Sequence, residues 1–182
     1  FPAVEGLYAK PTVVNNVETL ANVPPIIANG ADWYRQFGTE KSPGTKIFCL
    51  SGRVNKPGNY ELPLGTPIRY LIETCGGGII DGKAVKGILP AGASSSIMGP
   101  DKLDTPMDYE AMAAAGAMLG SASFIILDET VDAVWAAEKN IKFFKHESCG
   151  KCSPCREGTH WLAGVYKQVG EGRGTKQDEE LL

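Results

Sequence analysis

Three cysteines crowd into one short segment near the end of the chain. Cys149, Cys152 and Cys155 follow the spacing C-x2-C-x2-C. This spacing lets consecutive thiolates ligate three corners of a cubane iron–sulfur cluster. Such a geometry requires a loop, and Gly150 and Pro154 both favour one. The triplet therefore predicts a loop that presents three sulfur atoms to one ligand.

The other cysteines do not complete the ligand set. The chain has five cysteines, which is an odd number, and three of them lie within seven positions. This distribution favours a reducing compartment over a secreted disulfide framework. A [4Fe–4S] cluster usually takes four cysteines, but Cys49 and Cys75 lie in a strand pattern and at a helix end, as small apolar residues do. We expect the fourth ligand outside these 182 residues. Zinc and free thiols are the alternatives, although His146 and His160 do not match typical zinc spacing.

Helical patterns flank the triplet. Thr130 can cap a helix whose apolar face runs to His146, and a second helix is expected over about residues 154–169. Thr175 is typical of the cap of a further helix. The amides at the start of the second helix can point at the cluster sulfurs, and Lys145, Lys151 and Arg156 add positive charge nearby.

The middle of the chain predicts a small sheet with one helix. A turn at residues 56–59 joins two expected strands into a hairpin. Thr66 can cap a helix with Pro67 at its first position, and the glycine run at residues 76–78 ends it. The order of hairpin, helix and further strands is typical of a β-grasp, a small sheet curled over one helix. The expected strands cover residues 46–54, 60–64, 85–89 and 124–127.

The first residues differ from this pattern. Residues 1–12 are rich in glycine and proline and predict an extended loop, after which Asn16 can cap a helix with Glu18 in its first turn. The pair Pro24-Pro25 would interrupt this helix or begin a second one. Another short helix is expected over residues 31–37.

Charge and hydropathy exclude some classes of function. The net charge of −3 and the absence of polybasic runs argue against nucleic acid and against electrostatic attachment to a membrane. The longest uncharged stretch, residues 111–127, is too short and too weakly apolar for a membrane span. No signal peptide is evident. A start at Phe1 and an end in a charged segment suggest a piece of a longer protein.

Three segments together resemble one family. Residues 147–158, which contain the cysteine triplet, closely resemble the cluster segment of the flavin-bearing 51 kDa subunit of respiratory complex I type NADH dehydrogenases. Residues 10–20 resemble that family's flavin-proximal motif. Residues 51–54 with Pro57-Gly58 resemble the opening of its soluble-ligand-binding β-grasp (SLBB) domain. The order and distances of the three segments match over essentially the whole chain.

The resemblance implies an α+β architecture in three parts. Residues 1–44 would be the C-terminal part of an FMN- and NADH-binding α/β domain. Residues 45–128 would form the SLBB-like, ubiquitin-like β-grasp domain. Residues 129–182 would begin a helical [4Fe–4S]-binding domain that is incomplete here.

The resemblance also implies an activity. The family oxidises NADH through FMN and passes single electrons to a [4Fe–4S] cluster, toward quinone. Cys149, Cys152 and Cys155 would be cluster ligands. Because the family's glycine-rich nucleotide loops would lie upstream, this chain alone is expected to be inactive and to hold FMN weakly. The residues expected to line the FMN pocket are Val14, Asn15, Asn16 and Thr19.

Without the resemblance, Asn15-Asn16 is only a helix cap and turn. The implied partners are a [2Fe–2S] subunit and a larger multi-cluster subunit, with the complex on the cytoplasmic face of a bacterial membrane and no direct insertion. The diaphorase subunit of an NAD(P)-reducing hydrogenase or formate dehydrogenase is an alternative, since it shares all three motifs. An alternative of another class is a non-catalytic β-grasp module that binds a ligand or partner and carries a structural zinc.

Overall fold

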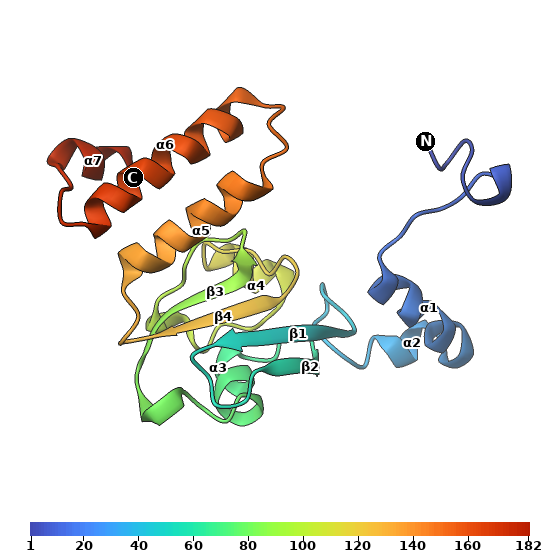
Figure 1. Cartoon of the computed structure of the whole chain (residues 1–182). Helices are drawn as coiled ribbons and strands as arrows, with labels where there is room; N and C mark the ends of the chain where they lie inside the picture. Colours follow the sequence, from blue (N-terminus) through green and yellow to red (C-terminus); the bar gives the residue numbers. More distant parts are fainter.

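A four-stranded sheet forms the centre of the computed structural model, which describes residues 1–182. The strand order is β2-β1-β4-β3 (Figure 1). The outer strands pair antiparallel with their neighbours, whereas the two inner strands, β1 and β4, are parallel. This confirms the α+β class and the expected hairpin. The strands are β1 (Thr45–Gly52), β2 (Gly58–Pro63), β3 (Val85–Ala93) and β4 (Ser123–Asp128).

A helical segment packs against the sheet and contributes several side chains to the core. It consists of α3 (Ile68–Tyr70) and the wider turn η2 (Leu71–Cys75), which continues it. Phe48 of β1 and Phe124 of β4 are both fully buried, with ring centroids 6.1 Å apart. They belong to the same apolar cluster as Ile68 and Leu71 of the helix. Burial of these side chains supplies most of the stabilisation of a domain of this size.

The start of α3 differs from the prediction. Thr66 does not cap it, because its Oγ1 donates to the carbonyl of Pro63 at 2.7 Å and closes the turn after β2. Pro67 occupies the cap position instead, and the first helical residue is Ile68. The expected glycine end is confirmed: Gly76 follows η2, and Gly77 and Gly78 adopt positive φ angles that other residues rarely adopt.

A buried carboxylate fixes the exit from the sheet. Asp128 ends β4 with no exposed surface, and its Oδ2 lies 2.8 Å from Nε of Arg53. Thr130 donates to Oδ1 of Asp128 through both its backbone N–H and its hydroxyl. These bonds, the Thr130 hydroxyl first and Arg53 next, lower the pKa of Asp128 to about 2. A buried charge is stable only when it is fully paired. Thr130 supplies two of the donors that Asp128 needs, so it is held at the end of the sheet and does not cap a helix.

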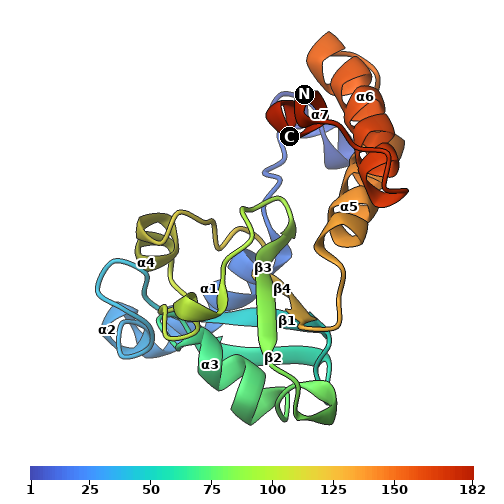
Figure 2. The same cartoon turned by 90° about the vertical axis from the view of Figure 1, so that its left-hand side faces the viewer.

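The C-terminal residues form a helical hairpin beside the sheet (Figure 1, Figure 2). The prediction that Thr130 caps its first helix is wrong, since Oδ1 of Asp132 accepts from the N–H of Trp135 at 2.7 Å. The Thr175 cap is confirmed by a reciprocal pair of bonds with Asp178. No helix in the structure has both the length and the apolar character needed to cross a membrane. The three helices are α5 (Ala133–Glu147), α6 (Ser153–Gly170) and α7 (Lys176–Leu181).

The N-terminal helix α1 (Val17–Asn29) runs through its two prolines without interruption, contrary to the prediction. Pro24 and Pro25 remove only their own N–H groups, and the helix is exposed, so water can reach the carbonyls left without a donor. Asn29 supports the last turn by donating to the carbonyl of Pro25 at 2.9 Å. Helix α2 (Ala31–Tyr34) is shorter than expected. The remaining short elements are η1 (Leu7–Ala9), η3 (Ile80–Gly82), η4 (Pro100–Lys102) and α4 (Tyr109–Ala114).

Candidate metal centre

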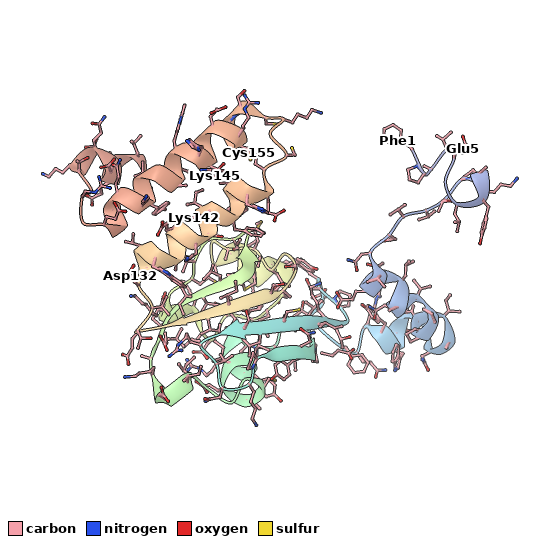
Figure 3. The ribbon with its side chains drawn as sticks, in the orientation of Figure 1. Phe1, Glu5, Asp132, Lys142, Lys145 and Cys155 are labelled. Carbon is pink, nitrogen blue, oxygen red and sulfur yellow. The ribbon has the colours of Figure 1, made fainter.

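The cysteine triplet lies at the tip of the α5–α6 hairpin. Cys149 is in the connecting loop, Cys152 is the N-cap residue of α6, and Cys155 is in its first turn. All three side chains are exposed. Gly150 makes the loop possible, because its φ of 73° lies in the left-handed region. Figure 3 shows Cys155 at the end of the hairpin far from Asp132, where α5 begins.

Polar contacts hold the loop in shape. The Ser148 hydroxyl accepts from the N–H of Gly150 at 3.3 Å and lies 3.4 Å from the sulfur of Cys155. Nη1 of Arg156 donates to the carbonyl of Gly150 at 2.8 Å, and Nη2 donates to the hydroxyl of Ser153 at 3.4 Å. The sequence indicated Arg156 only as a nearby positive charge. Its bracing role and that of Ser148 depend on contacts that spacing alone does not reveal.

The donor set fits an anionic, sulfur-ligated group. No side chain caps the start of α6, and the backbone N–H groups of Lys151, Cys152, Ser153 and Cys155 have no acceptor within the chain. Such free amides at the positive end of a helix dipole favour a bound anion. The thiols are not gathered around one point, and no group of three or more His, Cys, Asp or Glu side chains has single-ion geometry. In a cluster each thiolate ligates a different iron.

The remaining cysteines and the histidines form no metal-binding group with this set. Cys49 in β1 and Cys75 at the end of η2 are half-buried rather than fully buried. Cys75 packs against the core, and burial raises the pKa of its thiol. His146 and His160 are exposed, and Nδ1 of His146 lies 3.2 Å from a carboxylate oxygen of its neighbour Glu147.

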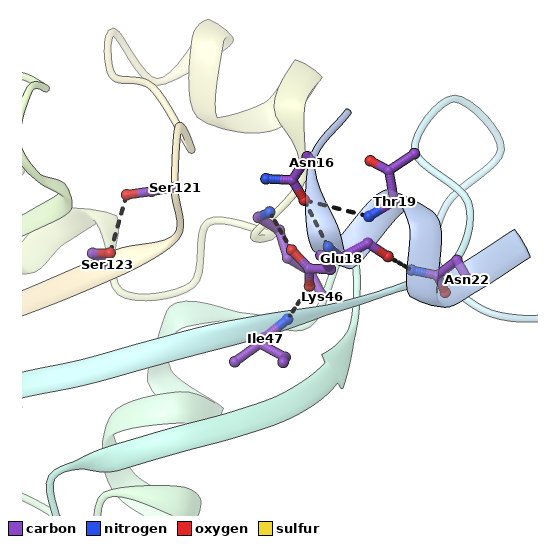
Figure 4. Close-up of polar contacts among 8 residues, drawn as sticks. All are labelled: Asn16, Glu18, Thr19, Asn22, Lys46, Ile47, Ser121 and Ser123. Carbon is purple, nitrogen blue, oxygen red and sulfur yellow. Dashed lines mark hydrogen bonds and ion pairs between the residues drawn. The ribbon is translucent and has the colours of Figure 1, made fainter. Parts of the chain in front are cut away.

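The segment expected to line a flavin is exposed around the start of α1. The interpretation of Asn16 as a helix cap is confirmed, since its Oδ1 accepts from the N–H groups of Glu18 and Thr19 at 2.8 and 3.3 Å (Figure 4). Oδ1 of Asn15 accepts from the N–H of Asn16 at 2.8 Å. The Nδ2 groups of both asparagines have no acceptor in the chain. That Val14, Asn15, Asn16 and Thr19 line an FMN pocket stays a prediction.

Glu18 links this segment to the sheet. Its Oε2 lies 3.1 Å from Nζ of Lys46, and its Oε1 accepts from the N–H of Ile47 at 2.8 Å (Figure 4). The sequence indicated Glu18 only as an acidic residue in the first turn of a helix. Its partners lie on a strand distant in sequence, so no local pattern predicts the contact. No hydrogen bond joins residues 14–19 to the loop that carries the cysteine triplet.

Two family models match the chain in the order of these parts. The SLBB domain matches residues 47–95, and the NADH-ubiquinone oxidoreductase-F iron-sulfur binding region matches residues 135–182. An F-type subunit of NADH-quinone oxidoreductase from Rhizobium meliloti is 49% identical over the whole chain, which covers 43% of that relative. The HndC subunit of an NADP-reducing hydrogenase from Solidesulfovibrio fructosivorans is 42% identical over the whole chain, which covers 37% of it.

A solved structure shares the fold. The crystal structure of an NAD+-reducing [NiFe]-hydrogenase in the air-oxidized state superposes with a TM-score of 0.82 at 35% identity, over 98% of this chain and 30% of that one. Fold and site thus define a β-grasp domain followed by an iron–sulfur binding region. The chain belongs to the family of F-type, 51 kDa subunits of NADH-quinone oxidoreductase, and matches the C-terminal region of that family. It spans about two fifths of the length of the curated relatives named above.

Proposed function

We propose that this chain is the electron-receiving part of a subunit that oxidises NADH through FMN and passes single electrons to a [4Fe–4S] cluster. The observation that carries the proposal is the loop at the hairpin tip, where three exposed thiols and four unpaired amides lie within the matched iron–sulfur region. Cys149, Cys152 and Cys155 would hold the cluster. FMN supplies the conversion of a two-electron hydride into single-electron transfers.

The flavin-side residues would act by hydrogen bonding and shape. Val14, Asn15, Asn16 and Thr19 lie together on an exposed surface, and the two free Nδ2 groups are donors suited to flavin or phosphate oxygens. Glu18 would keep this surface in register with β1. Residues 1–44 would then complete an FMN- and NADH-binding domain, residues 45–128 the β-grasp, and residues 129–182 the start of the cluster domain.

The relatives' names indicate multi-subunit assemblies. We further propose partners that carry a [2Fe–2S] cluster and several further clusters, on the cytoplasmic face of a bacterial membrane, with quinone as the eventual acceptor. The diaphorase of an NAD(P)-reducing hydrogenase is the second candidate, favoured by the similarity to HndC and to the [NiFe]-hydrogenase structure. Copurification decides between them, because a [NiFe] or other hydrogen-active subunit would accompany only the diaphorase.

An anaerobic reduction of the full-length protein tests the proposal. Addition of NADH is expected to bleach the flavin absorbance and then to produce the paramagnetic signal of a reduced [4Fe–4S] cluster. The control is the same titration with dithionite, which reduces the cluster directly. Stoichiometric zinc, or no iron signal with either reductant, would overturn the electron-transfer proposal.

The substitution Asn16→Asp separates the two roles of Asn16. Aspartate caps helices as well as asparagine does, so the stability of α1 should be unchanged. The substitution replaces the Nδ2 donor with a negatively charged oxygen. The affinity for FMN is therefore expected to fall by about tenfold or more, which is the usual effect of losing a hydrogen bond to a charged group. Flavin content and the FMN dissociation constant measure the effect. Unchanged FMN affinity would limit Asn16 to capping, and Asn29→Asp, at the far end of α1, is the matched control.

A further inference from the structure

The residue before the triplet lies against one of its thiols. Ser148 follows the last residue of α5, and its hydroxyl oxygen is 3.4 Å from the sulfur of Cys155, seven positions later in the chain. The same oxygen accepts from the N–H of Gly150 at 3.3 Å. Ser148 is half-buried, whereas Cys155 is exposed. The fold of the loop therefore brings one hydroxyl to one prospective ligand.

The direction of this bond must reverse when iron is bound. With a free thiol, the sulfur donates to the serine oxygen. A cysteine sulfur that ligates iron has lost its proton and can only accept. A serine hydroxyl has one donor and two acceptor positions, so Ser148 can accept from Gly150 and still donate to Cys155.

We propose that Ser148 donates a hydrogen bond to the Cys155 sulfur in the cluster-loaded protein and raises the reduction potential of the cluster. The inference rests on the function proposed above, because it requires Cys155 to be a ligand. Hydrogen bonds to ligand sulfurs are one of the levers that set cluster potentials. A donor stabilises negative charge, the reduced cluster carries one more negative charge than the oxidised one, and reduction is therefore favoured.

The same motif contains a matched control. Ser153 has a hydroxyl of the same chemistry, but its contact is with Nη2 of Arg156 at 3.4 Å, and no sulfur lies within hydrogen-bond distance of it. Removing that hydroxyl should leave the potential unchanged. Ser148 is thus a positioning residue. Its effect on the reduction potential depends on the place of its hydroxyl beside Cys155, and other hydroxyls of the loop do not share this effect.

The test is a redox titration of the full-length protein followed by electron paramagnetic resonance. Ser148→Ala is expected to make reduction about threefold to tenfold less favourable, and a tenfold change corresponds to 59 mV for one electron. Ser148→Thr should retain the wild-type potential, and Ser153→Ala should match it. Iron and acid-labile sulfide are measured on every variant, so that each potential refers to an intact cluster.

The outcomes separate this inference from the proposed function. If the wild-type protein contains no cluster, the proposed function fails. If Ser148→Ala keeps its iron and titrates at the wild-type potential, the role of Ser148 is refuted while the proposed function stands. If Ser148→Ala loses its cluster, the isosteric pair Ser148→Thr and Ser148→Val decides: a lower potential or lower iron content in the valine variant supports the hydroxyl donor, and equality of the two overturns it.

Discussion

Replacing Cys152 with serine is expected to remove the cluster from the full-length protein. Iron should fall from about four atoms per protein to nearly none, with parallel loss of acid-labile sulfide, because a [4Fe–4S] cluster depends on its cysteine ligands. The expected consequence is that NADH still reduces the flavin but no paramagnetic cluster signal follows. Iron analysis and electron paramagnetic resonance measure both effects.

The matched control for this substitution is Cys49→Ser. Cys49 is half-buried in β1, far along the chain from the hairpin loop, and has no place in the proposed ligand set. This variant should keep its iron and its signal. Full iron content in Cys152→Ser, or equal loss in both variants, would contradict the assignment of the ligands.

Replacing Phe124 with alanine is expected to destabilise the β-grasp domain by about 3–5 kcal/mol, the usual cost of removing a buried aromatic ring. Phe124 is fully buried on an inner strand and packs on Phe48. Because side chains alternate along a strand, Ile125 faces the other side of β4 and is only half-buried. Ile125→Ala should therefore cost much less, about 1 kcal/mol. Urea unfolding monitored by circular dichroism compares the two, and equal losses would contradict this assignment of the core.

The sequence predicted several structural elements correctly where the residues that determine them lie close together in the chain. The four expected strands all formed, the C-x2-C-x2-C segment lies in a loop between helices as expected, and the cap at Thr175 formed. Asn16 caps α1 for the same reason: the bonded groups lie within three residues of one another.

Where a distant contact competed with a local one, the prediction failed. Thr130 has the right sequence position for a helix cap, yet the buried carboxylate of Asp128 holds it, and that burial depends on Arg53, which follows β1 far earlier in the chain. Thr66 failed as a cap for a local reason, because its hydroxyl donates to the carbonyl of Pro63 and closes the turn after β2. Glu18 and Ser148 were missed as site residues because their partners depend on how α1 meets the sheet and how the hairpin loop folds back.

The parallel pairing of β1 with β4 has a consequence for folding during synthesis. β4 lies inside the sheet, between the first strand and β3, so the ribosome must release residues through Asp128 before the sheet can close. Contacts of such long sequence separation slow folding. The cysteine loop emerges only afterwards, beyond the link that Asp128 makes with Arg53. The nascent thiols would thus reach the iron-delivery machinery attached to a domain that is already able to fold.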